Sequence, residues 1–428
     1  MPRLDISLND ITIGKIEVDT DTDIFALDYT TSWMENGYAI SPHLPLSGTK
    51  TSIAIKRFLE NLLPEGKGLD DLSSFKHIPK NNIFALIRAI GFETSGALSF
   101  TGKEKEDKPI FREITDKELE KRIGEIESKS IIIWDKEQRL SLAGVQEKLT
   151  VIFQDGKLGL ADGNLSSTHI LKFQTQRTEH MVINEYFCMS LAKKVGLSVA
   201  NVELRKYGIY PVLSVERFDR VVYETHIERL HIIDGCQMLN LAPKDKYERN
   251  YGSSRDVMHI RQGANFSKLF SACDKCVVPA VAKLKLLDWA IYSLIIGNSD
   301  AHGKNISFFV DMHGIYVAPY YDMLSIVMHD NVDHELAMAY GDEFNINNVL
   351  GYPLRAFSDE INLSPKLVSS QILKICKKTR DVLLAHGFLD TSILDTKEKE
   401  FTTRLEKVIL DRVDILEESG KEMLKVSW

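Results

Sequence analysis

The sequence GNSDAHGKN, Gly297 to Asn305, stands between two apolar segments of different character. The run before it, Leu284 to Ile296, is long enough for a buried helix, whereas Ile306 to Val310 after it has the composition of a strand. A helix is therefore predicted to end at Gly297, where a polar loop begins. Glycine is the residue that most readily takes up the left-handed conformation found just after many helices.

Asp300 and Asn305 stand five positions apart in this loop. Enzymes that transfer phosphoryl groups use this spacing for a carboxylate that orients a hydroxyl group and an amide that binds a metal. Asp322 follows Asn305 by seventeen positions, after a predicted hairpin with its turn at His313-Gly314. The hairpin should return Asp322 toward the loop, so that its carboxylate and the Asn305 amide converge on Mg²⁺. The alternative is an ordinary turn that uses the same residue types, and His302 is interpreted as a hydrogen-bond partner that stabilises the loop.

Length and composition describe an ordinary globular protein. The 428 residues predict two domains or lobes, and 44% of them are hydrophobic and 27% charged. The formal net charge of −8 argues against a surface that grips polyanions, because such surfaces are usually basic. A link to nucleic acid would therefore run through a partner.

The cysteines and the chain termini bear on location. Five cysteines, an odd number, predict a reducing compartment. Cys273 and Cys276 form one CxxC without a second pair, which does not favour a zinc site. The sequence lacks a signal segment and an apolar run of the roughly 20 residues needed to span a bilayer. We expect a cytoplasmic protein with no membrane contact.

The first part of the chain has the patterns of a small α/β module followed by more strands. Residues 3 to 30 alternate apolar and polar positions, which predicts short antiparallel strands. Charges crowd together from Thr101 to Lys129, which indicates an exposed linker and then a short solvated helix. Strands are expected from Arg139 to Ala161, with a hairpin turn at Asp155-Gly156.

A strand lysine and a helical glutamate come next. Lys172 lies in the apolar strand HILKF, and Glu185 lies in a helix predicted from Met181 to Val195. This order of lysine and buried glutamate holds ATP phosphates in kinases, although a lysine at a strand end can also simply reach solvent. From about Ile233 onward helical patterns dominate, and Ser364-Pro365 predicts a helix start.

Taken together in their order, six motifs resemble the HipA-type serine/threonine toxin kinases of bacteria. They are RLSLAGVQEK (Arg139 to Lys148), HILKF, NEYFCMSLAKKVGL, VERFDR, GNSDAHGKN and YYDMLS. The resemblance implies an α+β, two-lobed protein-kinase-like fold with an α/β N-terminal domain and a mainly α-helical C-terminal domain. We divide the chain into residues 1–102, 103–232 and 233–428: a first module, a kinase N-lobe and a helical C-lobe.

The resemblance also implies a role for individual residues. Asp300 would orient the substrate hydroxyl, Asn305 and Asp322 would bind Mg²⁺, and Glu185 would support Lys172. The remaining residues expected to contact ATP are Lys172 at the phosphates, Glu216 and Phe218 at the adenine edge, Tyr321 at the adenine face, Gln237 near the nucleotide, and Ala143, Gly144 and Val145 in the phosphate-covering loop. Ser141 stands where the family autophosphorylates. That loop has one glycine, Gly144, instead of the several found in glycine-rich phosphate loops.

The function predicted from this resemblance is an ATP- and Mg²⁺-dependent protein serine kinase that acts as a toxin. Its substrate would be an aminoacyl-tRNA synthetase or another translation component, and a small DNA-binding, HipB-like antitoxin would neutralise it and bring it to operator DNA. Two alternatives are a small-molecule phosphotransferase with the same site and a catalytically silent DNA-regulatory subunit. Segments 101–130 and 330–343 carry no recognised motif.

Overall fold

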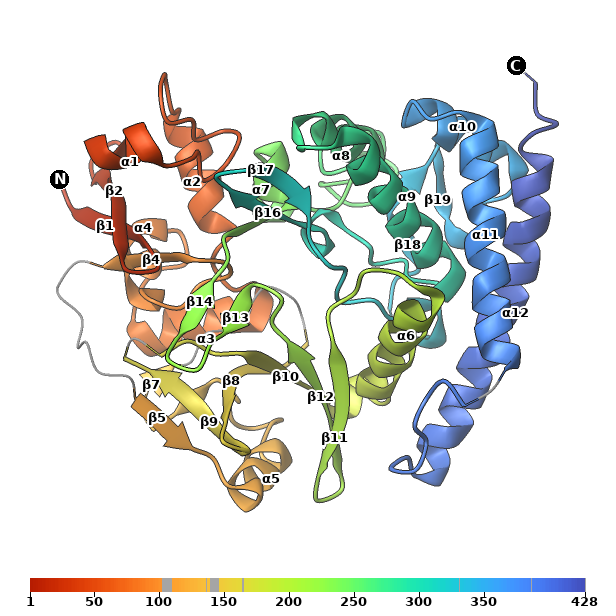
Figure 1. Cartoon of the computed structure of the whole chain (residues 1–428), viewed down its shortest axis with the longest axis horizontal. Coiled ribbons are helices and arrows are strands. Elements are labelled where there is room, and N and C mark those ends of the chain that lie inside the picture. The colour runs from red at the N-terminus through yellow and green to blue at the C-terminus, as the bar shows by residue number, and fades with distance from the viewer. Residues whose placement is uncertain are drawn as a thin grey trace. The chain divides into compact units, whose positions relative to one another are not determined.

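The computed structural model describes residues 1–101, 110–135, 137–138, 146–163, 165–330, 332–385 and 387–427. The chain divides into two compact units (Figure 1). Unit 1 comprises Met1–Glu179, Glu203–Pro243 and Phe308–Ile315, and unit 2 comprises His180–Val202, Lys244–Ser307 and Tyr316–Trp428. The division into 1–102, 103–232 and 233–428 stays a prediction.

An antiparallel sheet in the order β3-β2-β1-β4 opens unit 1. Its strands are β1 (Arg3–Leu8), β2 (Ile11–Asp19), β3 (Ile24–Tyr29) and β4 (Leu98–Thr101), and the helices between them are α1 (Thr31–Asn36), α2 (Ser52–Glu60), α3 (Gly66–Lys76) and α4 (Ile83–Ile90). Asn9 adopts the left-handed conformation, φ 52°, in the turn between β1 and β2. The alternating pattern of residues 3 to 30 thus forms the short antiparallel strands that it predicts.

A six-stranded sheet in the order β11-β12-β10-β8-β9-β5 follows in unit 1. Its strands are β5 (Ile110–Glu113), β8 (Lys148–Gln154), β9 (Lys157–Asp162), β10 (His169–Phe173), β11 (Val202–Tyr207) and β12 (Tyr210–Glu216). Asp155 and Gly156 join β8 to β9 with φ values of 51° and 75°. Positive φ at both central residues is typical of the two-residue hairpin turn that this dipeptide predicts.

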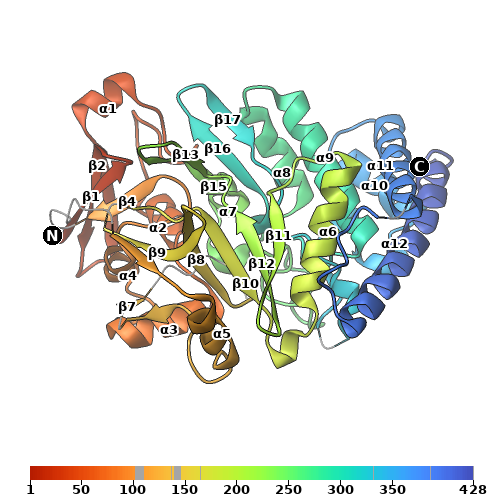
Figure 2. The ribbon, with the colours of Figure 1, turned by 60° about the horizontal axis from the view of Figure 1, so that its bottom comes forward.

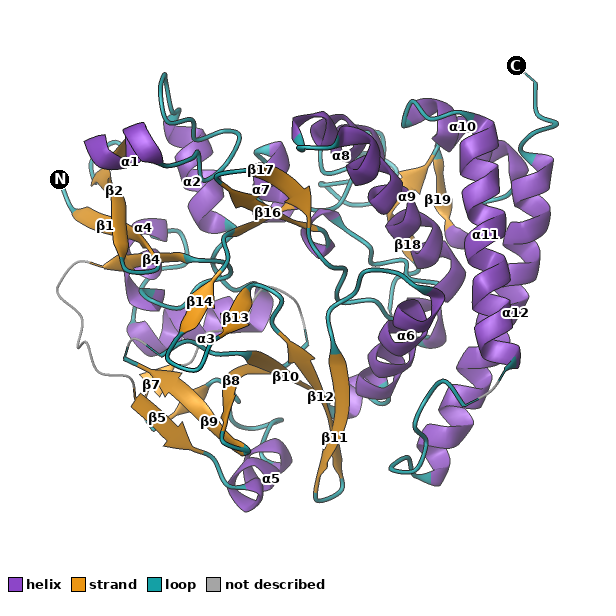
Figure 3. Cartoon of the chain, viewed as in Figure 1, coloured by secondary structure: helices purple, strands orange, loops and turns teal. Residues whose placement is uncertain are grey.

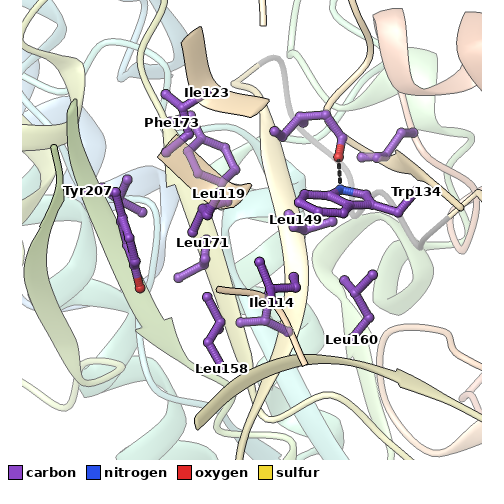
Figure 4. Packing of buried hydrophobic residues seen from close by; sticks show 14 of the residues in the cluster. Ile114, Leu119, Ile123, Trp134, Leu149, Leu158, Leu160, Leu171, Phe173 and Tyr207 are labelled. Atoms are coloured by element: carbon purple, nitrogen blue, oxygen red, sulfur yellow. Dashed lines mark hydrogen bonds between the residues drawn. The ribbon is translucent and has the colours of Figure 1, made fainter. Parts of the chain in front are cut away.

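One face of this sheet carries an apolar core (Figure 4). Helix α5 (Asp116–Gly124) buries Leu119 and Ile123 in it, so the solvated helix expected at this position is solvated on one side only. Trp134 packs in the same core, and its indole N–H donates a hydrogen bond of 2.6 Å to the carbonyl of Ile131. Two apolar positions four residues apart were enough to bury one face of a highly charged helix.

The chain also contains short strands and helices outside these two sheets. The strands are β6 (Ile133–Trp134), β7 (Glu137–Gln138), β13 (Arg220–Val222), β14 (Ile227–Arg229), β15 (Ile232–Asp234), β16 (Ser307–Asp311) and β17 (Gly314–Val317). The short helices are α7 (Gly235–Leu239) and the 3₁₀ turns Gln176–Thr178, Pro243–Asp245, Cys273–Lys275, Gly303–Asn305, Ile326–Met328 and Ile346–Asn348. Most strands belong to unit 1 and most long helices to unit 2 (Figure 3).

Unit 2 is mainly helical, as the C-terminal patterns predict. Its helices are α6 (Met181–Val195), α8 (Phe266–Ala272), α9 (Pro279–Ile296), α10 (Gly351–Glu360), α11 (Pro365–Leu384) and α12 (Thr396–Glu422). The two longest, α11 and α12, run side by side and contact α6 and α9 (Figures 1 and 2). The Ser364 side chain accepts a hydrogen bond from Leu367 N–H and caps α11, which begins at Pro365. No helix in the described part of the chain is both long and apolar enough to cross a membrane.

The acidic stretch 330–343 contains structure that its sequence did not indicate. Strand β18 (Glu335–Tyr340) pairs with β19 (Glu343–Asn345) across a turn in which Gly341 has φ 64°. Five consecutive residues of β18, from Leu336 to Tyr340, are buried. A strand buried on both faces does not alternate, so the pattern that reveals half-buried strands is missing here.

A buried charge cluster ties the first module to the end of β12 within unit 1. The Asp219 carboxylate accepts hydrogen bonds from Arg217 and Arg220, at 2.8 and 2.7 Å, and from Gly96 N–H at 2.8 Å. Arg217 also pairs with Glu93 at 3.0 Å, and Arg229 donates to the backbone carbonyl groups of the same module. Burial by itself would raise the pKa of the Asp219 carboxyl, but the guanidinium groups of Arg217 and Arg220 lower it well below its usual value.

We predict that Asp219→Asn destabilises the protein by about 3–5 kcal/mol at pH 7, because it removes the carboxylate that pairs with buried Arg220 and leaves buried Arg217 with Glu93 alone. Since the folded-state pKa of Asp219 lies below that of the unfolded chain, its contribution is present above about pH 4 and declines as the pH falls further. Urea unfolding of both proteins at several pH values measures this. The matched control is Glu203→Gln in the exposed Arg205–Glu203 pair, which should cost less than about 1 kcal/mol. Equal losses in the two variants would contradict the assignment.

Candidate active site

Helix α9 ends where the sequence predicts, and the polar loop follows at once. Gly297 caps the helix with φ 72°, and its N–H bonds to the carbonyl of Leu294. A side chain at Gly297 would bring its Cβ within 2.4 Å of Val327 Cγ2. Both the left-handed backbone and this close approach therefore require glycine.

Hydrogen bonds within the loop hold its shape. The backbone N–H of His302 donates to Asn305 Oδ1 at 3.1 Å, and Lys304 N–H donates to His302 Nδ1 at 3.3 Å. Asp300 is half-buried, and its backbone carbonyl accepts from His302 N–H at 2.8 Å. The prediction that His302 stabilises the loop is confirmed, because its ring caps the 3₁₀ turn Gly303–Asn305.

The second carboxylate returns to the loop as the hairpin predicts. Asn305 Nδ2 donates a hydrogen bond of 2.8 Å to Asp322 Oδ2, so the amide and carboxylate are in direct contact. Asp322 has φ 57°, an uncommon conformation for a residue other than glycine. Such conformations persist only where the surrounding structure imposes them, and they are frequent at functional sites.

Anchors on both sides impose that conformation. Before Asp322, Tyr320 forms a parallel bridge to Val199, and its hydroxyl donates to Lys285 O on α9 at 2.6 Å. After Asp322, the side chain of Asn184 on α6 accepts from Ser325 N–H and donates to Ser325 O, each at 2.8 Å. Asn184 and Ser325 are both fully buried. The segment that carries Asp322 is therefore fastened to two helices.

A histidine completes the second anchor. The Nε2 atom of His329 lies 3.0 Å from Asn184 Nδ2. Burial, together with the neighbouring His180, lowers the pKa of His329, which favours the neutral ring that can accept this hydrogen bond.

Two tyrosines contact the loop: Tyr321, which the sequence predicts at the adenine face, and Tyr247, which the sequence analysis did not single out. The hydroxyl of Tyr321 donates to the carbonyl of Lys304 at 2.6 Å and lies 2.8 Å from Ser307 Oγ. The hydroxyl of Tyr247 donates to Asp300 Oδ1 at 2.8 Å. Tyr247 is 53 positions from Asp300, and no local motif points to it. That Tyr321 contacts the adenine face stays a prediction.

The residues expected at ATP in unit 1 lie on and after the central strands. Lys172, which is 6% exposed, lies on β10 opposite Lys148 of β8 and Leu213 of β12. Its neighbours along β10, Leu171 and Phe173, point into the apolar core, so Lys172 emerges on the other face of the sheet.

Glu216 and Phe218, the residues expected at the adenine edge, lie at and just after the end of strand β12, and Gln237 lies on helix α7. Glu216 ends β12 and is exposed, and the Phe218 ring packs nearly perpendicular to the Phe309 ring, with 5.9 Å between centroids. The side chain of Gln237 caps α7, where its oxygen accepts from Asp234 N–H at 3.0 Å and its amide donates to Phe58 O at 3.1 Å. Its contacts are thus those of a structural cap, and its expected contact with nucleotide stays a prediction.

The expected Glu185–Lys172 pair and the phosphate-covering loop stay predictions. Glu185 is buried on α6 in unit 2, whereas Lys172 belongs to unit 1, and their pairing stays a prediction. Ser141, Ala143, Gly144 and Val145 lie outside the described residues.

Comparison with known proteins assigns both parts of the chain to one family. The HipA N-terminal domain family matches residues 4–101, and the HipA-like C-terminal domain family matches residues 140–383. The serine/threonine-protein kinase toxin HipA of Shewanella oneidensis is 42% identical over 418 residues, which are 96% of this chain and 95% of that protein. The putative kinase Y4mE of Sinorhizobium fredii is 30% identical and covers 89% of this chain, with 91% of its own length matched.

A solved structure agrees with these matches over the whole fold. The Shewanella oneidensis toxin-antitoxin complex of HipA, HipB and operator DNA contains a chain that superposes with a TM-score of 0.90 at 40% identity. The match covers 99% of this chain and 100% of that one. The two-lobed, kinase-like α+β fold predicted from the sequence is thereby confirmed. The chain therefore belongs to the HipA family of kinases.

Proposed function

We propose that this kinase is a toxin that uses ATP and Mg²⁺ to phosphorylate serine or threonine in a protein of the translation machinery. The observation that carries the proposal is the contact of Asn305 with Asp322 beside a loop that presents Asp300. Mg²⁺ prefers carboxylate and amide oxygens as ligands. Asp322 supplies a carboxylate, and Asn305 Oδ1 keeps one lone pair beyond the hydrogen bond that it accepts from His302 N–H, so both residues can offer the ion an oxygen. Mg²⁺ bound there would neutralise charge on the transferred phosphoryl group.

The chain's own residues divide the work of the reaction. Asp300 accepts a hydrogen bond from the incoming serine or threonine hydroxyl and orients it toward the phosphorus. Lys172 contacts the phosphates, and it lies opposite Lys148 on the same face of the sheet. Backbone groups of Glu216 and Phe218 bind the adenine edge, and Tyr321 contacts its face. Ala143, Gly144 and Val145 cover the phosphates, and Glu185 supports Lys172.

The substrate, the partner and the location are inferred from the family. The relative with 42% identity is named a serine/threonine-protein kinase toxin, and its structure holds HipB and operator DNA. We infer that this chain phosphorylates an aminoacyl-tRNA synthetase or another translation component, and that a small HipB-like antitoxin binds it. Such a substrate and ATP place its action in the cytoplasm, where its five cysteines, all buried, would remain thiols.

The two site carboxylates should fail in different ways. Asp300→Ala should abolish detectable transfer with little change in Mg²⁺-ATP affinity, because Asp300 acts on the incoming hydroxyl. Asp322→Ala should abolish transfer and also weaken Mg²⁺-ATP binding, since it holds the metal. Titration calorimetry with a kinase assay measures both, and Asp342→Ala, at a side chain that is 96% exposed, is the control. Equal weakening of nucleotide binding in both variants would show that the roles are misassigned.

Ser141 is proposed to be an off-switch. A phosphate on it would add about −1.5 to −2 charges, which makes a position beside the ATP phosphates unfavourable. We expect phosphorylated protein to bind ATP poorly, the modification to require Asp300, and Ser141→Ala to keep nucleotide binding. Mass spectrometry of wild type and Asp300→Ala, followed by ATP titration of the separated forms, checks this. Undiminished ATP affinity in the phosphorylated form would refute the switch.

Binding to operator DNA should require the antitoxin. The net charge of −8 leaves the isolated chain poorly suited to neutralise DNA phosphates. In gel-shift titrations at physiological salt, we expect specific binding by the antitoxin complex and none by the chain alone at nanomolar concentration. Nanomolar, sequence-specific binding by the isolated chain would contradict this proposal.

A further inference from the structure

Tyr247 reaches the proposed catalytic aspartate from a segment with no role in the function described so far. Its hydroxyl donates to Asp300 Oδ1 at 2.8 Å, and its ring packs nearly perpendicular to the His302 ring, with 5.2 Å between centroids. Both contacts fall on the loop Gly297 to Asn305, so the tyrosine touches the catalytic loop at two places. The ring contact restricts the directions in which the hydroxyl can point.

Backbone hydrogen bonds fasten the tyrosine's segment to the same loop. Gly303 N–H donates to Lys246 O at 3.0 Å, one residue before Tyr247. Glu248 N–H, one residue after it, donates to Ala337 O at 2.9 Å. Ala337 lies on β18, and its own N–H donates to Ser299 O at 2.8 Å, next to Asp300. A closed path of hydrogen bonds therefore connects both sides of Tyr247 to both sides of Asp300.

The buried carboxylate of Glu248 reinforces this frame. Glu248 is 1% exposed, and its side chain accepts from Ala339 N–H at 2.8 Å and from Arg261 Nε at 2.6 Å. Strand β18 is thus held at two N–H groups, that of Ala337 by Ser299 O and that of Ala339 by the Glu248 carboxylate. Tyr247 stands on a rigid support, which is what the precise placement of a neighbouring functional group requires.

We propose that Tyr247 is a positioning residue for phosphoryl transfer. A carboxylate on a short side chain can rotate about its Cβ–Cγ bond, and a hydrogen bond from a fixed hydroxyl to Oδ1 selects one rotation. Oδ2 then keeps a constant direction relative to the incoming serine or threonine hydroxyl. Small errors in such an alignment are costly because the reacting groups must meet in a narrow geometry. The proposal rests on the proposed role of Asp300.

The substitution Tyr247→Phe removes only the hydroxyl and retains the ring. We expect the turnover number to fall about 10- to 100-fold, the range that loss of one hydrogen bond to a charged group produces. Mg²⁺-ATP affinity by calorimetry should stay within about twofold, and the thermal midpoint should shift by no more than a few degrees. Tyr251→Phe is the matched control, since Tyr251 is four residues away and 58% exposed, and its kinetics should equal those of wild type.

An unchanged turnover number in Tyr247→Phe would overturn the inference, and so would a variant in which only the affinity for nucleotide falls. A lower turnover number accompanied by a fall in thermal midpoint of more than a few degrees would also overturn it, because the loss would then reflect a destabilised fold. The experiment includes Asp300→Ala so that the two proposals can fail separately. Activity retained in Asp300→Ala would refute the proposed active site itself. An inactive Asp300→Ala beside a fully active Tyr247→Phe would refute only the positioning role.

Discussion

The hydrogen bond between Asn305 and Asp322 depends on a backbone conformation that a free chain rarely adopts. Asp322 has φ 57°, and its carboxylate meets Asn305 only because the chain is fixed at Tyr320 and again at Ser325. The first anchor uses α9 and the second uses α6, the two helices that the long C-terminal helices α11 and α12 pack against. The packed helices of unit 2 thus hold the segment that carries Asp322 in its uncommon backbone conformation.

Unit 1 buries several arginine side chains. Arg217 and Arg220, which are buried just after β12, form ion pairs with Asp219 and Glu93. Buried Arg229, on β14, donates instead to backbone carbonyl groups of the first module. Glu93 comes from the first module, so that module is part of the support of the segment after β12. The sequence motif VERFDR, which suggested a nucleotide-binding hinge, is therefore also a structural element: its alternate residues, Arg217 and Asp219, face inward.

Local signals predicted the elements well, and tertiary contacts explain what they missed. Helix α6 and strand β10 have the predicted bounds, and the caps Ser364 and Gly297 end or begin helices as expected, because each depends on nearby residues. Strand β18 was missed because burial on both faces removes alternation. Tyr247 was missed because only the folded chain brings it to Asp300. The Asn305–Asp322 contact was predictable, since one hairpin separates the two residues.

The central claim is that Asp300 directs phosphoryl transfer from ATP to a protein hydroxyl. The most direct measurement is a reaction with γ-phosphate-labelled ATP in an extract of cells, in which the purified wild type is compared with Asp300→Ala. The account predicts label on serine or threonine of discrete proteins with the wild type and none above background with the variant. Label found only on small metabolites, or equal protein labelling by both, would contradict it.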